Sequence, residues 1–322
     1  MQSMLLGLLL APVWITLAEQ ARGAPQREGV SVRLMRQVAD PSTYRLLRIA
    51  PLTGALGAEI TGVDLSQPLN EAARAEVLRA LYDHLVIYFP DQPGFTRERH
   101  LELARLFGPL QKIPHIFSVE GYPDVQIVRR EPGESRRYVG EGFHADSTFL
   151  ATPPTTVTMH CIEAPEVGGD TAFANLQLAY ETLSPAMQTL LAGLRAVHSA
   201  ARLFGSRGTD PSQVMMKEMK VEEGDAEVTH PIVRTHPGSG RKGLFVHAAY
   251  TQRIEGMTAE ESAPLLQFLY QHCARIEYTC RVRWRKHMVL VWDNRCTHHS
   301  AIGDYDALRY IERVTTGGEI PV

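Results

Sequence analysis

The chain has few cysteines, no excess of positive charge and no C-x-x-C pair, and each absence removes a class of protein. Its 322 residues include four cysteines, so neither a disulfide scaffold nor a thiolate zinc site is expected, and the thiols fit a reducing compartment. The 33 Lys and Arg stand against 36 Asp and Glu, which gives a formal net charge of −3. Because nucleic-acid-binding domains usually carry a basic stripe, we expect no nucleic acid partner.

A long apolar run is also missing. The uncharged segment 4–18 is shorter than the roughly 20 residues that a spanning helix requires, and Pro12 interrupts it. We expect no membrane association, and interpret residues 1–43 as a dispensable leader and flexible arm, or as a misassigned start with translation beginning near Met35. An export signal ranks second, because no Lys or Arg precedes the apolar segment.

Residues 44–322 are expected to form a single domain. The chain is 44% hydrophobic and 21% charged, which suits a globule with a sizeable core. Helices are predicted after Asn70 and Thr96, and after a capping box formed by Thr258 and Glu261. Strands are predicted over residues 46–49, 58–63, 85–90, 125–128, 156–162, 244–246, 281–284, 288–292 and 309–315. Many short strands and few helices indicate an α+β, mainly β fold, a jelly-roll barrel with flanking helices.

The segment around His144 and Asp146 carries the first chemical signal. The two residues are two apart, and on a strand such positions project to the same face. An imidazole and a carboxylate side by side are suited to bind one metal ion. Taken alone, a His-x-Asp pair is also compatible with two polar residues on a surface strand.

A later pair of histidines strengthens the metal interpretation. His298 and His299 follow the segment Trp292–Asp293–Asn294, and either one would complete a set of two histidines and one carboxylate. This facial triad leaves coordination positions open and is typical of non-haem Fe(II) oxygenases. A zinc hydrolase uses similar ligands, so the triad does not decide the metal.

Two arginines near the C-terminus favour the oxygenase. Arg309 and Arg313 are four apart in a run with β character, so both are predicted to face one side of a strand. A guanidinium pairs bidentately with a carboxylate. Dioxygenases that use 2-oxoglutarate need such an anchor for the distal carboxylate of the keto acid, and the order His-x-Asp, His, Arg matches that need.

The chain resembles the TauD/TfdA family of Fe(II)- and 2-oxoglutarate-dependent dioxygenases from about Tyr44 to Gly318. The resemblance is carried by the stretches PLTGALGAEITGVDL, GFHADSTF, GGDTAFAN, HPGSGRKGLFVH, VWDNRCTHHSA and RYIERVT. It implies a double-stranded β-helix, Fe(II) as the metal, and 2-oxoglutarate and O2 as cosubstrates. The resemblance is also compatible with a homo-oligomer.

The family pattern assigns roles to individual residues. The iron ligands fall on His144, Asp146 and His299, which leaves His298 outside the set. The 2-oxoglutarate anchor falls on Arg309, with the hydroxyl of Thr171 beside it. Arg313 matches the arginine that binds the anionic group of the substrate.

The expected substrate is a small organic anion. Family members that hydroxylate taurine carry polar residues where this chain has Ile113, Ile116 and Gly140, so the pocket is expected to be apolar, with Ile113 and His115 near the substrate. The stretches SVEGYPDVQIVRRE and QRIEGMT resemble the aryloxyalkanoate (phenoxypropionate) branch, which implies oxidative C–O cleavage in an aryloxyalkanoate-like carboxylate. The alternatives are taurine, an alkylsulfonate or an alkyl sulfate as substrate and, more distantly, a zinc hydrolase or a non-catalytic β-barrel binding protein. The resemblance assigns no role to His247. Because the enzyme needs 2-oxoglutarate, we expect it to be located in the cytoplasm.

Overall fold

The computed structural model describes residues 40–113, 115–134, 140–204, 206 and 220–322. The predicted leader and arm, residues 1–43, therefore lie almost entirely outside the described residues. Within the described part, no helix combines the length and the apolar character needed to cross a bilayer. Residues 41–43 form a short 3-10 turn, η3 (Pro41–Thr43).

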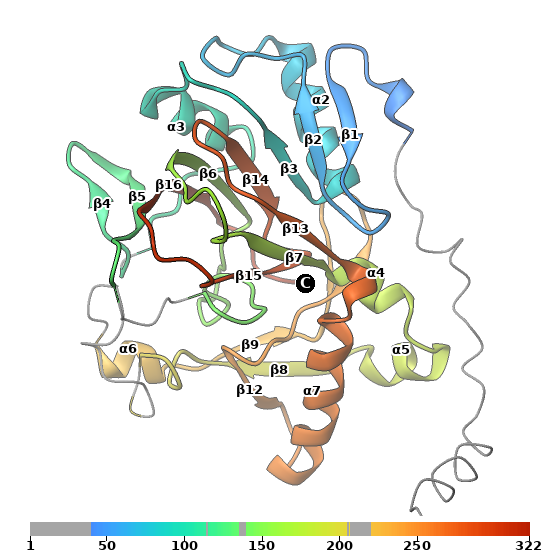
Figure 1. Ribbon diagram of the computed structural model, residues 1–322. Coiled ribbons are helices and arrows are strands. Elements are labelled where there is room, and N and C mark those ends of the chain that lie inside the picture. Colours follow the sequence, from blue (N-terminus) through green and yellow to red (C-terminus); the bar gives the residue numbers. More distant parts are fainter. Residues whose placement is uncertain (1–39, 114, 135–139, 205, 207–219) are drawn as a thin grey trace, which may run out of the picture. The chain divides into compact units, whose positions relative to one another are not determined.

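The largest sheet has eight strands in the order β1-β2-β3-β14-β6-β16-β5-β4 (Figure 1). Its strands are β1 (Arg48–Pro51), β2 (Ala58–Thr61), β3 (Val86–Phe89), β4 (Ser118–Val119), β5 (Tyr122–Arg130), β6 (Thr156–Glu163), β14 (Val289–Asp293) and β16 (Arg309–Thr316). All neighbours are antiparallel except β2 and β3. Strands distant in sequence, such as β3 and β14, thus lie side by side.

Three smaller sheets complete the strands of the described residues. One has the order β13-β7-β15, with β13 (Thr279–Val282), β7 (Thr171–Asn175) and β15 (Thr297–Ala301). Another has the order β12-β8-β9, with β12 (Thr251–Ile254), β8 (Arg195–His198) and β9 (Val228–Pro231). The last pairs β10 (Val233–Thr235) with β11 (Lys242–Leu244).

The helices begin where capping chemistry predicts. They are α2 (Glu71–His84), α3 (Arg97–Arg105), α4 (Leu176–Glu181), α5 (Pro185–Leu191), α6 (Val221–Asp225) and α7 (Ala259–Cys273), with the 3-10 helix η5 (Ile276–Tyr278). The side chain of Asn70 accepts a hydrogen bond from the N–H of Ala73 at 2.9 Å. Thr258 and Glu261 form the reciprocal capping box that starts α7. The predictions of these starts, and of the helix after Thr96, are confirmed.

Strand β14 shows how the sheet separates two hydrophobic cores. Successive side chains point to opposite faces. Val289 and Val291 pack into a cluster with residues of α2, whereas Leu290 and Trp292 pack into a cluster with residues of β7 and β13. Both faces of the strand are buried, which explains its continuous apolar sequence. The small sheet β13-β7-β15 is thereby held against one face of the large sheet.

The fold is mixed α and β with strands predominating, as the sequence predicted. Several boundaries differ by one to three residues, and the predicted strand 244–246 shares only Leu244 with β11. Strand β7 was not predicted. Its sequence is short and lies between β6 and α4, so its strand conformation depends on pairing with β13 and β15.

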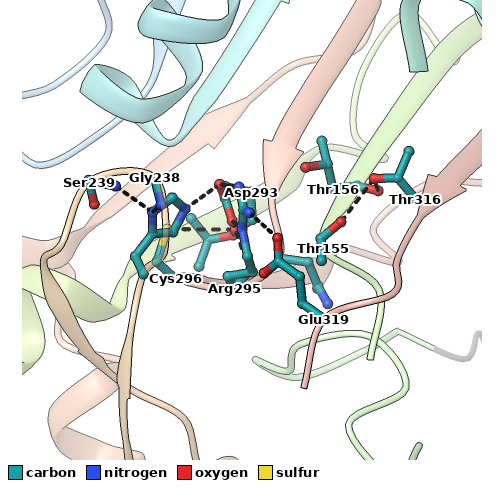
Figure 2. A network of polar contacts seen from close by, with 12 residues as sticks. Thr155, Thr156, Gly238, Ser239, Asp293, Arg295, Cys296, Thr316 and Glu319 are labelled. Carbon is teal, nitrogen blue, oxygen red and sulfur yellow. Dashed lines mark hydrogen bonds and ion pairs between the residues drawn. The ribbon is translucent and has the colours of Figure 1, made fainter. Parts of the chain in front are cut away.

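A buried polar network fixes the turn between β14 and β15 (Figure 2). Asp293 is fully buried and accepts hydrogen bonds from Arg295 at 2.6 and 2.9 Å and from His236 at 2.9 Å. Arg295 also pairs with Glu319 at 3.0 Å. Burial alone would raise the pKa of Asp293, but the charge and hydrogen bonds of Arg295, and those of His236, hold this pKa well below its ordinary value. The network holds the start of β15 in place.

We predict that Arg295→Met destabilises the protein by about 3 kcal/mol, because the substitution leaves the buried Asp293 carboxylate without its main partner. Thermal unfolding followed by circular dichroism measures the effect. Arg253→Met is the control, because Arg253 pairs with Glu227 on the surface, where both side chains are more than 40% exposed, and it should cost at most about 1 kcal/mol. Equal effects of the two substitutions would contradict the prediction.

Candidate active site

Three predicted ligands converge in the structure. His144, Asp146 and His299 each offer a ligand atom, and these atoms lie within 4.8 Å of one another. The Nε2 atoms of both histidines are 3.8 Å from Oδ1 of Asp146. His298 does not belong to this group; its ring lies against that of His247, with 5.3 Å between the centroids. Adjacent residues of β15 thus point to opposite faces.

Backbone pairing brings the first ligand to the last. The N–H of His144 donates to the carbonyl of His299 at 3.0 Å, and the N–H of His299 donates back at 2.8 Å. This bridge is isolated, and a turn follows it in which Ser147 has a φ of 47°. The prediction of a strand through His144 and Asp146 is therefore wrong. The two side chains converge because the chain turns after one bridge, an arrangement that depends on β15.

The charge states suit a divalent metal. Nδ1 of His144 lies 2.9 Å from the carbonyl oxygen of Gly142, which can only accept, so Nδ1 carries a proton and Nε2 is the ring nitrogen that faces Asp146. Burial, and next the nearby His144, hold the pKa of His299 well below 6.5. Burial would raise the pKa of Asp146, but the charge and the hydrogen bond of Arg313 hold it below its ordinary value. Two imidazoles and one carboxylate form a donor set that fits a first-row metal ion.

An asparagine that the sequence analysis did not select holds Asp146 in place. The side-chain oxygen of Asn294 accepts from the N–H of Asp146 at 2.8 Å, and its amide nitrogen donates to the carbonyl oxygens of Asp146 and Pro154 at 3.2 and 2.9 Å. Asn294 is fully buried, and all these bonds link it to segments distant in sequence. In the sequence, only its position in the Trp292–Asp293–Asn294 segment, five residues before His299, could have pointed to this role.

The predicted cosubstrate anchors lie in the same cavity as the three ligands. Arg309 is 3% exposed, and its Nε donates to the carbonyl of Gly169 at 3.1 Å. The hydroxyl oxygen of Thr171 accepts a hydrogen bond from the indole N–H of Trp284 at 3.0 Å. The guanidinium carbon of Arg309 lies 5.4 Å from the Trp284 ring centroid. Arg309 and Thr171 therefore share one aromatic neighbour.

Arg313, the predicted substrate anchor, contacts the predicted ligand carboxylate. Its Nη2 donates to Oδ2 of Asp146 at 2.8 Å, while the ligand imidazoles lie near the other oxygen, Oδ1. Nε of Arg313 is buried and has no hydrogen-bond partner among the described residues. The side chain lines the cavity and so offers an unused donor beside the three ligands.

The cavity has a volume of about 260 Å³ and a mostly apolar wall. His115 and Ile116 line it, whereas Ile113 does not. Ile113 is fully buried, and its carbonyl accepts a hydrogen bond from Gln126. Burial, together with the charge of Arg313, lowers the pKa of His115 to about 4, so this wall residue is neutral at pH 7. Gly140, at a position predicted to lack a polar group, also lines the cavity.

The strand-rich fold and the two-histidine, one-carboxylate site beside buried arginines define the class, a non-haem metal-dependent oxygenase. The chain belongs to the TauD/TfdA family, because the family model "Taurine catabolism dioxygenase TauD, TfdA family" matches residues 48–315. It is accordingly an Fe(II)- and 2-oxoglutarate-dependent dioxygenase that uses O2. The predicted family is confirmed, and the zinc hydrolase and the non-catalytic barrel are set aside.

Relatives with different substrates resemble the chain to a similar degree. It is 33% identical over 279 residues to the alpha-ketoglutarate-dependent sulfate ester dioxygenase of Pseudomonas putida, covering 86% of this chain and 91% of the relative. It is 30% identical over 285 residues to the alpha-ketoglutarate-dependent 2,4-dichlorophenoxyacetate dioxygenase of Cupriavidus pinatubonensis, covering 83% and 96%. A solved taurine dioxygenase from Burkholderia xenovorans superimposes with a TM-score of 0.73 at 32% identity, covering 86% and 91%.

We predict that Asn294→Ala lowers metal affinity about 10- to 100-fold, because residues that orient a metal ligand typically contribute that much. Titration of the metal-free protein with Mn(II), followed by electron paramagnetic resonance, measures the dissociation constant. The control is Asn175→Ala, since Asn175 is also a buried asparagine but caps α4 and bonds to Ala55. Asn175→Ala should lower stability without changing metal affinity. Unchanged metal affinity in folded Asn294→Ala protein would rule out the role of Asn294.

Proposed function

We propose that the protein oxidises a small organic anion with an apolar body, an aryloxyalkanoate-like carboxylate, and cleaves its C–O bond. The observation that carries this proposal is the buried Nε of Arg313, which has no hydrogen-bond partner among the described residues and lies in an apolar cavity beside the three predicted ligand side chains. One edge of this guanidinium already pairs with Asp146, and its remaining buried Nε–H donor suits an oxygen of a second anion such as a substrate carboxylate. The apolar wall suits an aromatic or aliphatic body.

The same proposal assigns the other residues of the site. His144, Asp146 and His299 hold Fe(II), and Arg309 and the hydroxyl of Thr171 hold the distal carboxylate of 2-oxoglutarate. When bound, Fe(II) supplies the redox chemistry by which O2 and 2-oxoglutarate become succinate, CO2 and an oxygen atom inserted into a substrate C–H bond. We further propose that residues 44–322 form one domain with the double-stranded β-helix of the family, acting on a small molecule in the cytoplasm, where 2-oxoglutarate is formed.

Oxidative cleavage of an aryloxyalkanoate requires no reactant besides 2-oxoglutarate and O2. The C–H bond next to the ether oxygen becomes C–OH. The resulting hemiketal or hemiacetal collapses: the hydroxyl oxygen forms a carbonyl, the ether C–O bond breaks, and the hydroxyl proton leaves with the phenol. The products are a phenol and a 2-oxo acid, with succinate and CO2 from the cosubstrate.

Positioning is the contribution of the chain's own side chains. Arg313 bound to the substrate anion sets which carbon faces the ligand group, and a correct position of this kind accounts for much of the rate of such reactions. The wall formed by Ile116, Phe117 and Tyr250 excludes water from that carbon. His115 is neutral at pH 7, so it adds a hydrogen-bonding group without a second charge.

An alkyl sulfate ester is the second candidate substrate, favoured by the 33% identity to the sulfate ester dioxygenase. Such an ester also pairs an apolar body with an anion and carries a C–H bond next to oxygen. Arg313 and the apolar wall are also compatible with such an ester. The two substrate classes differ in the shape of the anion, which is planar in a carboxylate and tetrahedral in a sulfate.

We predict that kcat/KM, followed by succinate formation with Fe(II) and ascorbate, is highest for aryloxypropionates and aryloxyacetates. The two oxygens of a carboxylate lie in one plane and can both face the planar guanidinium of Arg313. The comparison panel holds alkyl sulfates and alkylsulfonates of equal length. Higher kcat/KM for the sulfates selects the second candidate, and no substrate-dependent succinate in metal-replete protein counts against both.

We predict that Arg313→Gln lowers kcat/KM for the organic anion about 30- to 1000-fold, the range expected when one partner of a buried ion pair is removed. Turnover of 2-oxoglutarate without substrate should persist. The control is Arg129→Gln, since Arg129 also lines the cavity but is half exposed and paired with Glu131. Metal affinity is measured in both, because Arg313 contacts Asp146. Equal losses in the two variants contradict the assignment.

A further inference from the structure

The cosubstrate end of the cavity contains a tryptophan in contact with both proposed 2-oxoglutarate anchors. We propose that Trp284 is a positioning residue for 2-oxoglutarate, which fixes the hydroxyl of Thr171 by a hydrogen bond and the guanidinium of Arg309 by its ring. Trp284 is 2% exposed and lines the cavity with them. The inference rests on the roles proposed above for Thr171 and Arg309.

The hydrogen bond determines where the Thr171 hydroxyl proton can go. An indole N–H only donates, so Trp284 occupies a lone pair of the Thr171 oxygen at 3.0 Å and leaves the hydroxyl proton free to donate. The described residues provide no acceptor for that proton. In the filled cavity, a carboxylate of 2-oxoglutarate is the natural acceptor, and a hydrogen bond to a charged group is stronger than one between neutral groups.

The ring holds the second anchor. The guanidinium carbon of Arg309 is 5.4 Å from the ring centroid of Trp284, within the range of a cation–π contact. On another side, Nε of Arg309 donates to the carbonyl of Gly169. These contacts come from separate segments, so the guanidinium is located before any ligand binds. A pre-positioned donor loses less conformational entropy on binding.

The strand register explains why Trp284 reaches both anchors. Thr171 is paired with Val282 at the end of β13, and Trp284 follows two residues later. A second tryptophan, Trp292, also lines the cavity, but its Nε1 is buried with no hydrogen-bond partner among the described residues. Of these two tryptophans, only Trp284 donates a hydrogen bond to a residue that is proposed to bind 2-oxoglutarate. The comparison with Trp292 shows that a buried tryptophan in the cavity wall does not necessarily form a hydrogen bond such as the one between Trp284 and Thr171.

The experiment measures 2-oxoglutarate binding without turnover. The full chain is loaded with Mn(II) in place of Fe(II), and 2-oxoglutarate is titrated calorimetrically with no organic substrate present. Trp284→Phe keeps a ring near Arg309 but removes the N–H, and it should weaken 2-oxoglutarate binding about three- to tenfold, the usual range for one hydrogen bond. Trp284→Leu also removes the aromatic face and should weaken it further. Mn(II) affinity should not change in either.

A double-mutant cycle separates the hydrogen bond from packing. If Trp284 acts through the Thr171 hydroxyl, Trp284→Phe should have no further effect on 2-oxoglutarate affinity in a Thr171→Val background. A full additional loss in that background overturns the hydrogen-bond inference. Wild-type affinity in Trp284→Phe, with weakened binding in Thr171→Val, overturns it as well.

Two further measurements distinguish a failure of the Trp284 inference from a failure of the proposed function. If Arg309→Gln and Thr171→Val both bind 2-oxoglutarate like the wild type, the proposed anchors are wrong, and that failure belongs to the proposed function. If Trp284→Phe does not fold, nitrogen-15 spectra of the Zn(II) form of the wild type still test the contact, because the chain has only three tryptophans. One indole signal should move in Thr171→Val and on addition of 2-oxoglutarate. If no indole signal responds to either change, the inference is overturned.

Discussion

The carboxylate of Asp146 is the group around which the site is organised. A buried charge is unfavourable unless it is paired, and here each oxygen has its own partners. Oδ2 accepts from Arg313, and Oδ1 lies 3.8 Å from the Nε2 atoms of the two ligand histidines. One carboxylate therefore connects the proposed metal ligands to Arg313, the proposed substrate anchor. Displacing it would disturb both at once.

Long-range contacts hold that carboxylate where it is. The backbone bridge between His144 and His299 attaches the ligand loop to β15, and Asn294 binds both peptide groups next to Asp146. Within the small sheet, β7 lies between β15 and β13, so His299 is opposite Phe173 and Thr171 is opposite Ala301. His299, Thr171 and Trp284, the proposed metal ligand, cosubstrate anchor and positioning residue, are thus carried by three neighbouring strands and their ends.

Local rules of the sequence predicted some of this well. The period of two in β16 placed Arg309 and Arg313 on one face, and both line the cavity. The same rule failed for His144 and Asp146, because the chain makes one bridge and then turns. It also gave no warning that Ile113 packs away from the cavity while Ile116 lines it. Turns and loop orientation depend on partners distant in sequence, which alternation does not reveal.

The sequence by itself determined the chemical inventory: two histidines, one carboxylate and two arginines in an order that fits a metal and an anionic cosubstrate, together with the helix caps and the buried strands. Only the tertiary structure decided which atoms meet. Asn294 reaches Asp146 across 148 positions, and Trp284 reaches Thr171 across 113. Residue types and local spacing fix donors, acceptors and strand faces, whereas contacts over such separations arise only when the strands pair and the cores between them pack.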